Sequence, residues 1–463
     1  MGRGGIWVWP ILEHRFKVQL NEKGDRTLKL GVIGTGHVGL VVAAALAELG
    51  HEVHCTDANT ELLNNLEKGI LPFFEPGLKE LFERNRKRIH CHSNIQAVVS
   101  PSTALFLAVG TPETTEGTSN LDALWKALQE VCATASEKKH LILKSTVPAG
   151  TAHRAKNLIK EHSQIAHSII SNPEFLRQGE AIEDFLRPDR IVVGHSTLEE
   201  REVMEKIYEP LLKNSSPKIL FMDNVSAELV KYSANSFLAL KISFINEMAL
   251  LCERLGANIE QVREGLTSDH RINPHFFTPG LGYGGSCFPK DVRALTETAK
   301  DLGFDLFTIE SAEKVNNRQK DLFFEKIKTQ LGSLNKKRIG VWGLSYKPGT
   351  DDLRRAPSVE ILQKLYSEGA QVQAYDPVAM ENAKQALKDQ FTPCESKEAA
   401  CEGADALLIF TEWPEFHTLQ LEQLKTLMRG NLIVDGRNLF DVQKMKSLGF
   451  NYLSVGRVSS LKI

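Results

Sequence analysis

The stretch between Leu28 and Asp57 constrains the fold more strongly than any other part of the sequence. A short apolar segment, Leu30–Ile33, leads into Gly-Thr-Gly-His-Val-Gly, and an alanine-rich segment then continues to about Leu49. A second short segment, Glu52–Cys55, leads to the acid at position 57. This order of strand, glycine turn, helix, strand and acid is typical of a βαβ unit that binds a dinucleotide.

The glycine spacing and the acid indicate which ligand such a unit holds. Glycines permit the tight turn and the close approach of a pyrophosphate, whose charge the helix N-terminus attracts. Asp57 can bond the ribose hydroxyls and would repel a 2′-phosphate, so the expected cofactor is NAD. The alternative is a structural βαβ turn without a ligand. The turn residues expected at the cofactor are Gly34, Gly36, His37, Val38 and Gly39.

Three further apolar segments end in turns that carry hydroxyl or carboxylate groups. They are Ala104–Val109 before Gly110 and Thr111, His140–Leu143 before Thr146, and Ser168–Ile170 before Glu174. Because the carboxyl ends of parallel strands face the ligand crevice, we expect these turns to line it. On sequence alone, Glu174 could equally be a helix cap or a surface acid.

A second glycine-rich stretch, Gly280–Asp291, surrounds a single cysteine. Glycines at this density let the backbone approach a bound molecule, which would expose Cys287 to a ligand. A nearby ammonium such as Lys290 could favour the nucleophilic thiolate, and Asp291 could move a proton or hold a water. The alternative is a small apolar cysteine in an ordinary loop.

The middle of the chain has the spacing of helices. Apolar residues recur at helical intervals from Val225 to about Leu255, where Lys231 and Asn235 lie four apart on one face. A lysine on a helix is usually solvated, so Lys231 is either a surface residue or part of a site. The segment Asp291–Leu331 also has helical spacing, which predicts an all-helical middle section.

A second α/β pattern begins near Lys336. Its expected strands are Arg338–Gly343, Val372–Tyr375, Ala406–Phe410 and Leu432–Val434, with a helix at Ser358–Gly369. This half lacks the full dinucleotide fingerprint. It carries Lys347, Arg354 and Arg437 at strand ends or in loops, and basic groups there suit a phosphorylated ligand.

The length of 463 residues exceeds what one hydrophobic core usually serves. We expect an N-terminal extension (1–28), an NAD-binding Rossmann-like domain (29–222), a central helical domain (223–330) and a second Rossmann-like domain (331–463). The fold class expected is α/β, with two doubly wound domains joined by a long central helix. In the extension, Gly5–Leu12 holds Trp7 and Trp9 but lacks the cleavage site of a signal peptide.

Charge and cysteine content exclude several classes of partner. The net charge is −2 with both signs interspersed, which does not predict a nucleic-acid or membrane surface. We also expect no apolar run long enough to cross a membrane. The seven cysteines show no CxxC pair and no metal-ligand spacing, which predicts a reducing, cytoplasmic compartment and no metal site.

With these motifs assembled, the sequence from Leu28 to the C-terminus resembles the UDP-glucose/GDP-mannose dehydrogenase family, and most closely its branch that acts on UDP-glucose. Besides the glycine turn and the cysteine stretch, the shared motifs are Glu75–Leu78, Ser145–Pro148, Asn172–Leu176 and Tyr346–Arg354. The resemblance implies a four-electron oxidation of the sugar C6 alcohol to a carboxylate, with two NAD⁺ used in succession. The product would be UDP-glucuronate, which serves polysaccharide biosynthesis.

The resemblance also implies roles for individual residues. Cys287 would form a thiohemiacetal and then a thioester, while Lys231 and Asn235 would stabilise oxyanions. Asp291, Thr146 and Glu174 would hold or activate the hydrolytic water. The cofactor contacts implied, besides the glycine turn and Asp57, are Gly110, Thr111, Thr146, Lys290 and Arg354. The substrate contacts implied are Glu174, Phe175, Leu176, Lys231, Asn235, Arg271, Phe276, Gly280, Tyr283, Gly284, Lys347 and Arg437.

In the family, the arginine that matches Arg271 reaches into the neighbouring subunit's site, which implies a homodimer or a higher oligomer with the central domain at its interface. Two positions depart from the family pattern. Gln178 stands where relatives commonly have glutamate, so a supporting carboxylate is absent. Leu62 stands near a position that is often basic, which removes one contact to the cofactor phosphate.

Two alternative functions remain at this point. The first is a sister enzyme that oxidises a UDP-N-acetylhexosamine or GDP-mannose with the same chemistry. The second is a non-catalytic sensor that binds NAD and a nucleotide sugar. A sensor predicts the loss of Cys287 or Lys231, and both residues are present.

Overall fold

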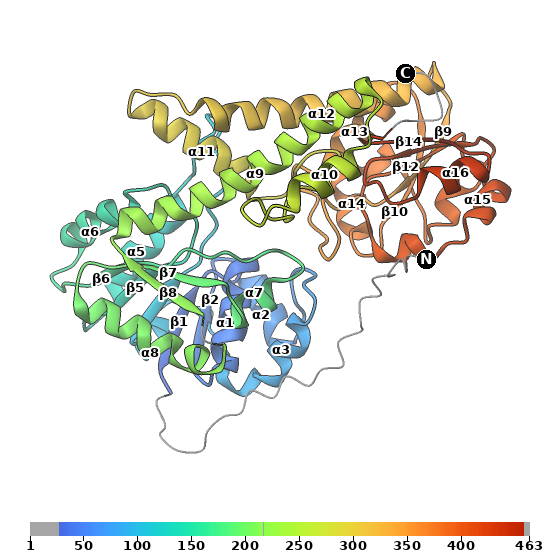
Figure 1. Cartoon of the computed structure of the whole chain (residues 1–463). Helices are drawn as coiled ribbons and strands as arrows, with labels where there is room; N and C mark the ends of the chain where they lie inside the picture. Colours follow the sequence, from blue (N-terminus) through green and yellow to red (C-terminus); the bar gives the residue numbers. More distant parts are fainter. Residues whose placement is uncertain (1–26, 216, 458–463) are drawn as a thin grey trace.

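A computed structural model describes residues 27–215 and 217–457. Two α/β domains, each built on a largely parallel sheet, are joined by a helical middle region (Figure 1). The predicted fold class is therefore confirmed. Most of the N-terminal extension, including Trp7 and Trp9, lies outside the described residues. The domain boundaries that we predicted stay predictions.

The first sheet has eight strands in the order β3-β2-β1-β4-β5-β6-β7-β8. Its strands are β1 (Lys29–Ile33), β2 (Glu52–Thr56), β3 (Ile89–Cys91), β4 (Ala104–Leu107), β5 (His140–Leu143), β6 (Ser168–Ser171), β7 (Arg190–Gly194) and β8 (Lys218–Met222). All neighbours are parallel except β6 and β7, which run antiparallel. The strand order reverses between β1 and β4, and a crevice at such a switch point is where α/β sheets bind ligands.

Eight α-helices accompany this sheet within the described residues. They are α1 (His37–Glu48), α2 (Thr60–Glu67), α3 (Leu78–Arg84), α4 (Gln96–Val99), α5 (Asp122–Thr134), α6 (Thr151–His162), α7 (Ala181–Leu186) and α8 (Leu198–Ser215). Helix α1 is small and apolar and is buried from Gly39 onward. A Cβ atom on Gly39 would lie 1.8 Å from the carbonyl oxygen of Gly34, so only glycine lets the helix start this close to the strand.

The middle region contains four α-helices: α9 (Asn224–Leu255), α10 (Ile259–Thr267), α11 (Phe288–Asp301) and α12 (Phe307–Leu331). The Asp223 side chain accepts a hydrogen bond from the Ser226 N–H to begin α9, and Gly256 at φ 75° ends it. The helical pattern that we predicted over Asp291–Leu331 is interrupted, because Gly303 at φ 85° turns the chain between α11 and α12. Helices α9 and α12 lie side by side above the two sheets (Figure 1).

The second sheet has six strands in the order β11-β10-β9-β12-β13-β14. These are β9 (Arg338–Trp342), β10 (Gln371–Tyr375), β11 (Thr392–Pro393), β12 (Ala406–Ile409), β13 (Leu432–Asp435) and β14 (Asn451–Ser454), with helices α13 (Pro357–Ser367), α14 (Met380–Leu387), α15 (Leu421–Leu427) and α16 (Val442–Ser447). Asp376 ends β10 as Asp57 ends β2. Its buried carboxylate, however, accepts hydrogen bonds from the Leu344 and Ser345 N–H groups and the Trp413 indole. The Asp376 carboxylate is therefore engaged in hydrogen bonds within the protein.

Helix α9 is, by length and composition, apolar enough to cross a membrane, contrary to our expectation that no such run exists. Its most apolar 18-residue window has a mean hydropathy of 1.2 and is 44% buried. Length and composition are weak evidence, because a core helix passes the same test. The first half of α9 packs on β6, β7 and α6, and its second half packs into the core of the second sheet.

Candidate active site

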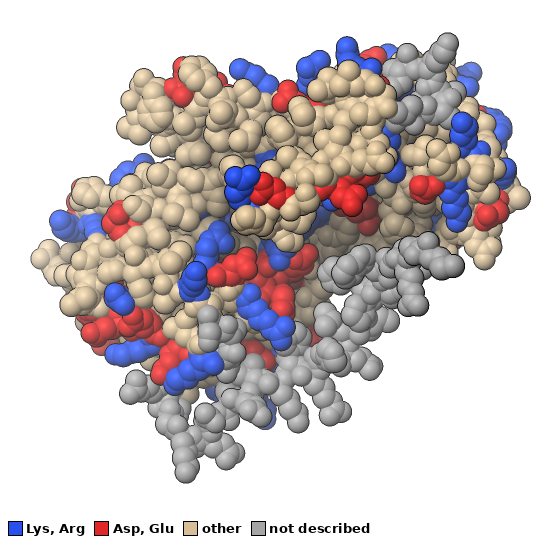
Figure 2. Space-filling view, in the orientation of Figure 1, with Lys and Arg blue, Asp and Glu red and all other residues tan. Residues whose placement is uncertain are grey.

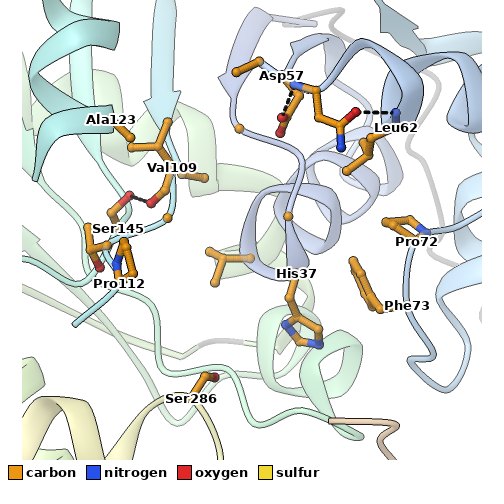
Figure 3. A pocket seen from close by; sticks show the side chains of 18 of the residues that line it. His37, Asp57, Leu62, Pro72, Phe73, Val109, Pro112, Ala123, Ser145 and Ser286 are labelled. Carbon is orange, nitrogen blue, oxygen red and sulfur yellow. Dashed lines mark hydrogen bonds between the residues drawn. The ribbon is translucent and has the colours of Figure 1, made fainter. Parts of the chain in front are cut away.

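One cavity of about 1510 Å³ spans all three regions of the chain. Its wall includes the glycine turn before α1, the ends of β2, β4 and β5, the start of α11, and the loop that carries Arg354. Figure 3 shows His37, Asp57, Val109, Pro112 and Ser286 arranged around this open space. On the face shown in Figure 2, basic and acidic side chains are interspersed over both domains.

The cofactor half of the cavity has the geometry that a dinucleotide requires. Gly34 adopts φ 95°, and a Cβ on Gly36 would meet nothing within 4 Å, which leaves room beside the N-terminus of α1. The Asp57 carboxylate accepts hydrogen bonds from the Thr35 N–H at 2.6 Å and the Thr35 hydroxyl at 3.2 Å. It thus fixes the turn and still lines the cavity where a ribose would lie. These residues fit NAD.

A buried glutamate from the Glu75–Leu78 motif joins the cofactor half to the loop after β6. Glu75 Oε2 lies 2.8 Å from His37 Nε2, and the same carboxylate accepts hydrogen bonds from the Gly179 and Ala181 N–H groups. The His37 ring also packs against Phe73, 4.7 Å between centroids. The sequence predicted Glu75 only as part of a motif, and Phe73 was not predicted.

The other half of the cavity, around Cys287, brings together residues from three separate segments. Lys231 Nζ lies 3.1 Å from Glu174 Oε1, and Asn235 donates a hydrogen bond to Asp291 Oδ2 at 2.6 Å. Asp291 Oδ1 in turn accepts a hydrogen bond from Lys290 Nζ at 2.6 Å. Lys231, Glu174, Asn235 and Asp291 are all buried, so the charged groups among them depend on one another for stabilisation. Burial rules out a solvated Lys231, although neither Lys231 nor Asn235 lines the cavity directly; their role in a site stays a prediction.

Cys287 lies at the N-terminus of α11, where it lines the cavity and is partly exposed. Burial of the sulfur and the nearby Glu174 carboxylate raise the pKa of the Cys287 thiol, although Lys231 opposes the shift. Lys231 thus acts as expected of a neighbouring ammonium, but burial and the nearby carboxylates outweigh it, so the net shift of the Cys287 pKa is upward.

The pKa values of the buried ion pair keep both partners charged. Burial alone would raise the pKa of Glu174, but Lys231 and the Leu176 N–H outweigh it and the net shift is downward. Burial alone would lower the pKa of Lys231, but Glu174 and other negative groups outweigh it and the net shift is upward. A fixed positive charge therefore stands beside the thiol.

Gln178 and Leu62 are the two positions that depart from the family pattern. The Gln178 amide donates a hydrogen bond to Asp352 at 3.0 Å and accepts one from the Tyr346 hydroxyl at 2.9 Å. Asp352 also accepts two hydrogen bonds from the Arg354 guanidinium, so Gln178 connects the first domain to the loop of this arginine. Leu62, on α2, lines the cofactor half of the cavity.

The residues expected at the substrate are divided between the cavity and its surroundings. Glu174 and Leu176 line the cavity, whereas Gly280 packs against the backbone of Gly436 and the side chain of Arg437. The Arg437 guanidinium donates hydrogen bonds to the carbonyl oxygens of Phe410 and Tyr346. The cysteine stretch and the second sheet therefore meet at these residues.

Four other expected substrate residues lie around this junction. Burial lowers the pKa of Lys347, and Gly284 approaches the Arg355 backbone so closely that its Cβ would lie 2.4 Å from the carbonyl oxygen. The Phe276 ring packs 5.9 Å from Phe288, and the buried Tyr283 ring lies 6.0 Å from the same side chain. The Tyr283 side chain is thus part of the core under α11.

Some of the remaining expected contact residues line the cavity, and others lie outside it. Phe175 forms cation–π contacts with Arg190 at 4.1 Å and Lys231 at 5.3 Å. Gly110, Thr111 and Thr146 line the cavity, and the Thr111 hydroxyl donates a hydrogen bond to the Thr146 carbonyl oxygen. The structure does not bring Arg271 to the cavity: its side chain is 78% exposed and pairs with Asp269 at 2.5 Å.

The cavity combines a dinucleotide site, formed by the glycine turn and Asp57, with the Cys287 thiol beside a buried lysine. A dinucleotide site next to a nucleophile is typical of one class of dehydrogenases. Models of the UDP-glucose/GDP-mannose dehydrogenase family match its NAD binding domain at residues 28–212, its central domain at 225–318 and its UDP binding domain at 340–442. The chain belongs to this family, and the resemblance noted from its motifs is confirmed.

Individual relatives match nearly the whole chain. A UDP-glucose 6-dehydrogenase of Pseudomonas aeruginosa is 40% identical over 93% of this chain and 98% of its own length. One of Rhizobium meliloti is 42% identical over 93% of this chain and 100% of its own. Among solved structures, a UDP-glucose dehydrogenase from Pyrobaculum islandicum is similar with a TM-score of 0.88 and 36% identity, covering 95% of this chain and 100% of that one.

Substitution of Asp57 by alanine is expected to weaken NAD binding by about tenfold to a hundredfold, because hydrogen bonds to a charged group each contribute about 1.5–3 kcal/mol. Binding of the nucleotide sugar should change far less, since Asp57 lies at the cofactor end of the cavity. Separate titrations of the two ligands, followed by protein fluorescence or calorimetry, measure both affinities. Equal losses for the two ligands would contradict the cofactor assignment.

Proposed function

We propose that this protein oxidises the C6 alcohol of UDP-glucose to the carboxylate of UDP-glucuronate, using two NAD⁺ in succession. One observation carries the proposal: a cysteine thiol lies in the cavity of an NAD-dependent dehydrogenase, beside the buried Lys231–Glu174 pair. A dehydrogenase that stops at the aldehyde has no use for such a thiol, whereas in oxidation to the acid a thiol can form a covalent adduct that is oxidised again.

NAD⁺, which the glycine turn and Asp57 would hold, would supply the hydride acceptor for both oxidations, and each oxidation would release one proton to solvent. After the alcohol has become an aldehyde, the Cys287 sulfur adds to the carbonyl carbon, and the thiol proton goes to the oxygen, which gives a thiohemiacetal. A second oxidation converts this to a thioester. Water then adds, the carbon–sulfur bond breaks, and the carboxylate leaves as the thiol is restored.

The residues around the sulfur are suited to these steps. Lys231 supplies a fixed positive charge and Asn235 an amide donor for the oxygen that becomes negative when sulfur or water adds. Asp291, Thr146 and Glu174 are proposed to hold and activate the hydrolytic water. Because burial and the nearby carboxylates raise the pKa of the Cys287 thiol, its proton is available for transfer when the carbon–sulfur bond forms. Arg354 is proposed at the cofactor, and Lys347 and Arg437 at the diphosphate.

The substrate assignment rests on the relatives. Those at 40% and 42% identity are UDP-glucose 6-dehydrogenases, whereas a structure named as a UDP-D-MAnNAc dehydrogenase, from Pyrococcus horikoshii, is 26% identical with a TM-score of 0.81. The sister activity on an N-acetylated sugar is therefore the second candidate. No such comparison favours the non-catalytic sensor, whose predicted loss of the thiol or of Lys231 does not occur.

The working form is proposed to be a homodimer or a multiple of it, in a cytoplasmic compartment. Helix α9 leaves Phe237, Phe244 and Leu251 exposed at seven-residue intervals, which supports a helix-mediated contact between two copies. The exposed Arg271 is proposed to complete the neighbouring subunit's site. All seven cysteines are free, which supports a reducing environment.

The proposal predicts two NADH per sugar. UDP-glucose at limiting concentration, with NAD⁺ in excess, should give two equivalents of NADH, measured by absorbance at the end point. One equivalent would indicate a simple alcohol dehydrogenase and would contradict the role of Cys287. Two equivalents with a UDP-N-acetylhexosamine or GDP-mannose, and none with UDP-glucose, would retain the mechanism and change the substrate.

A further inference from the structure

Helix α9 presents four polar side chains in one buried line toward the active site. Asn224, Glu228, Lys231 and Asn235 are spaced by four, three and four residues, so they lie on one face of the helix. The last two are proposed oxyanion donors, and Asn224 accepts a hydrogen bond from the Ser171 N–H at 2.9 Å. The proposed mechanism gives Glu228 no role, although this buried carboxylate lies between them.

The Glu228 carboxylate is fully engaged by the protein. Its Oε2 atom accepts a hydrogen bond from the Gly150 N–H at 2.7 Å. Its Oε1 atom accepts one from the Ala152 N–H at 2.8 Å and another from the Ser171 hydroxyl at 3.0 Å. Gly150 is the N-cap of α6 and Ala152 lies in its first turn, where unpaired N–H groups and the helix dipole favour a negative charge.

These three hydrogen bonds connect the segments that carry the proposed hydrolytic residues. Thr146 lies in the short loop 144–150 between β5 and α6, so the α6 N-terminus fixes the far end of this loop. Ser171 ends β6, three residues before Glu174. Lys231, which pairs with Glu174, follows Glu228 by less than one turn of α9. Glu228 therefore joins the three segments that carry Thr146, Glu174 and Lys231.

We propose that Glu228 is a positioning residue for thioester hydrolysis, acting through the Thr146 loop and Glu174 rather than by touching the substrate. This inference rests on the proposed function, because it assigns the residue to the second half of that reaction. A displacement of about 1 Å at a reacting group can slow a step about a hundredfold. The water-dependent step should be the one affected, because the two segments that Glu228 holds carry its proposed water ligands.

The test replaces Glu228 by glutamine. Glu228→Gln keeps the shape of the side chain but turns one accepting oxygen into an NH₂ group that faces backbone N–H donors, so at least one of the three hydrogen bonds is lost. The matched control is Glu200→Gln. Glu200 is also buried and accepts hydrogen bonds from the Ser196 and Thr197 N–H groups, but these belong to the turn between β7 and α8, which carries none of the proposed water ligands.

Full-length protein is mixed with UDP-glucose and NAD⁺, quenched at intervals and weighed intact by mass spectrometry. We expect Glu228→Gln to lower kcat by about tenfold to a hundredfold. It should also accumulate a covalent sugar-nucleotide adduct on Cys287, with NADH still formed up to that stage and the KM for NAD changed less than twofold. Glu200→Gln should neither lose kcat nor accumulate adduct, even if its thermal unfolding temperature falls as far.

A milder variant, Ser171→Ala, removes only one of the three hydrogen bonds. It should also accumulate adduct and lower kcat, by a smaller factor than Glu228→Gln. This variant keeps the test decisive if Glu228→Gln does not fold. A fall in kcat without adduct in the variant that folds would overturn the inference, as would equal effects in Glu228→Gln and the control. Failure of the proposed function is distinguishable, because unmodified protein would then release only one NADH per sugar.

Discussion

Cys287→Ser protein is expected to lose acid formation by a factor of about a thousand or more, because removing an enzyme's covalent nucleophile commonly costs at least that much. Serine retains the size of the side chain, but its hydroxyl is a far weaker nucleophile than the thiol at neutral pH. NAD binding should stay within about twofold of the unmodified protein, since the glycine turn and Asp57 lie elsewhere in the cavity.

The measurement combines NADH formation under multiple turnover with a direct titration of NAD. Cys394→Ser is the matched control, because Cys394 is also a partly exposed free thiol but lies on the second sheet, outside the cavity. It should retain full activity. Sustained formation of acid by Cys287→Ser would contradict the covalent mechanism. Unchanged activity would mean that Cys287 has only the structural role that the sequence also allowed.

Lys231→Met is expected to lower kcat by about a hundredfold to a thousandfold, the usual effect of removing one preorganised donor from a developing oxyanion. It should also destabilise the fold by about 3–5 kcal/mol, because Glu174 would be left as an unpaired buried carboxylate. Since Lys231 opposes the rise in the pKa of the Cys287 thiol, its loss should raise that pKa further. Alkylation of Cys287 by iodoacetamide should therefore need a higher pH.

Urea unfolding, NADH assays and the pH dependence of alkylation measure these three effects. Lys241→Met is the control, because Lys241 is also on α9 but contacts backbone carbonyl oxygens of Ile272 and Asn273 instead of a carboxylate. The double variant Lys231→Met with Glu174→Gln should recover most of the lost stability without recovering activity. Recovery of activity in the double variant would mean that the lysine serves only to balance the charge of Glu174.

The sequence predicted those features that depend on residues close together in the chain. The βαβ unit at Leu30–Asp57 follows from local strand, turn and helix signals, and α9 follows from apolar spacing over more than eight turns. Strands β7 and β8 were not predicted. Both carry short apolar runs, Ile191–Val193 and Ile219–Met222, which are the ordinary signal of a strand, so these two strands were predictable from local sequence.

The site was predicted in its parts but not in its pairings. Nothing local couples Lys231 to Glu174, 57 positions earlier, or Asn235 to Asp291, because these contacts exist only after three segments have packed together. The pKa of Cys287 could not be predicted for the same reason: its direction depends on burial and on carboxylates from other elements. Glu228 did leave a signal, since polar residues spaced by four, three and four on an apolar helix indicate a buried polar face.

Helix α9 gives the molecule a mechanical property beyond the chemistry of its side chains. Its 32 residues form a rod of about 48 Å, with Lys231 and Asn235 in the half that packs on the first sheet and Ile245 and Ala249 in the core of the second. One continuous helix therefore spans both domains. A change in the angle between the domains that keeps both sets of packing contacts requires this helix to bend or twist.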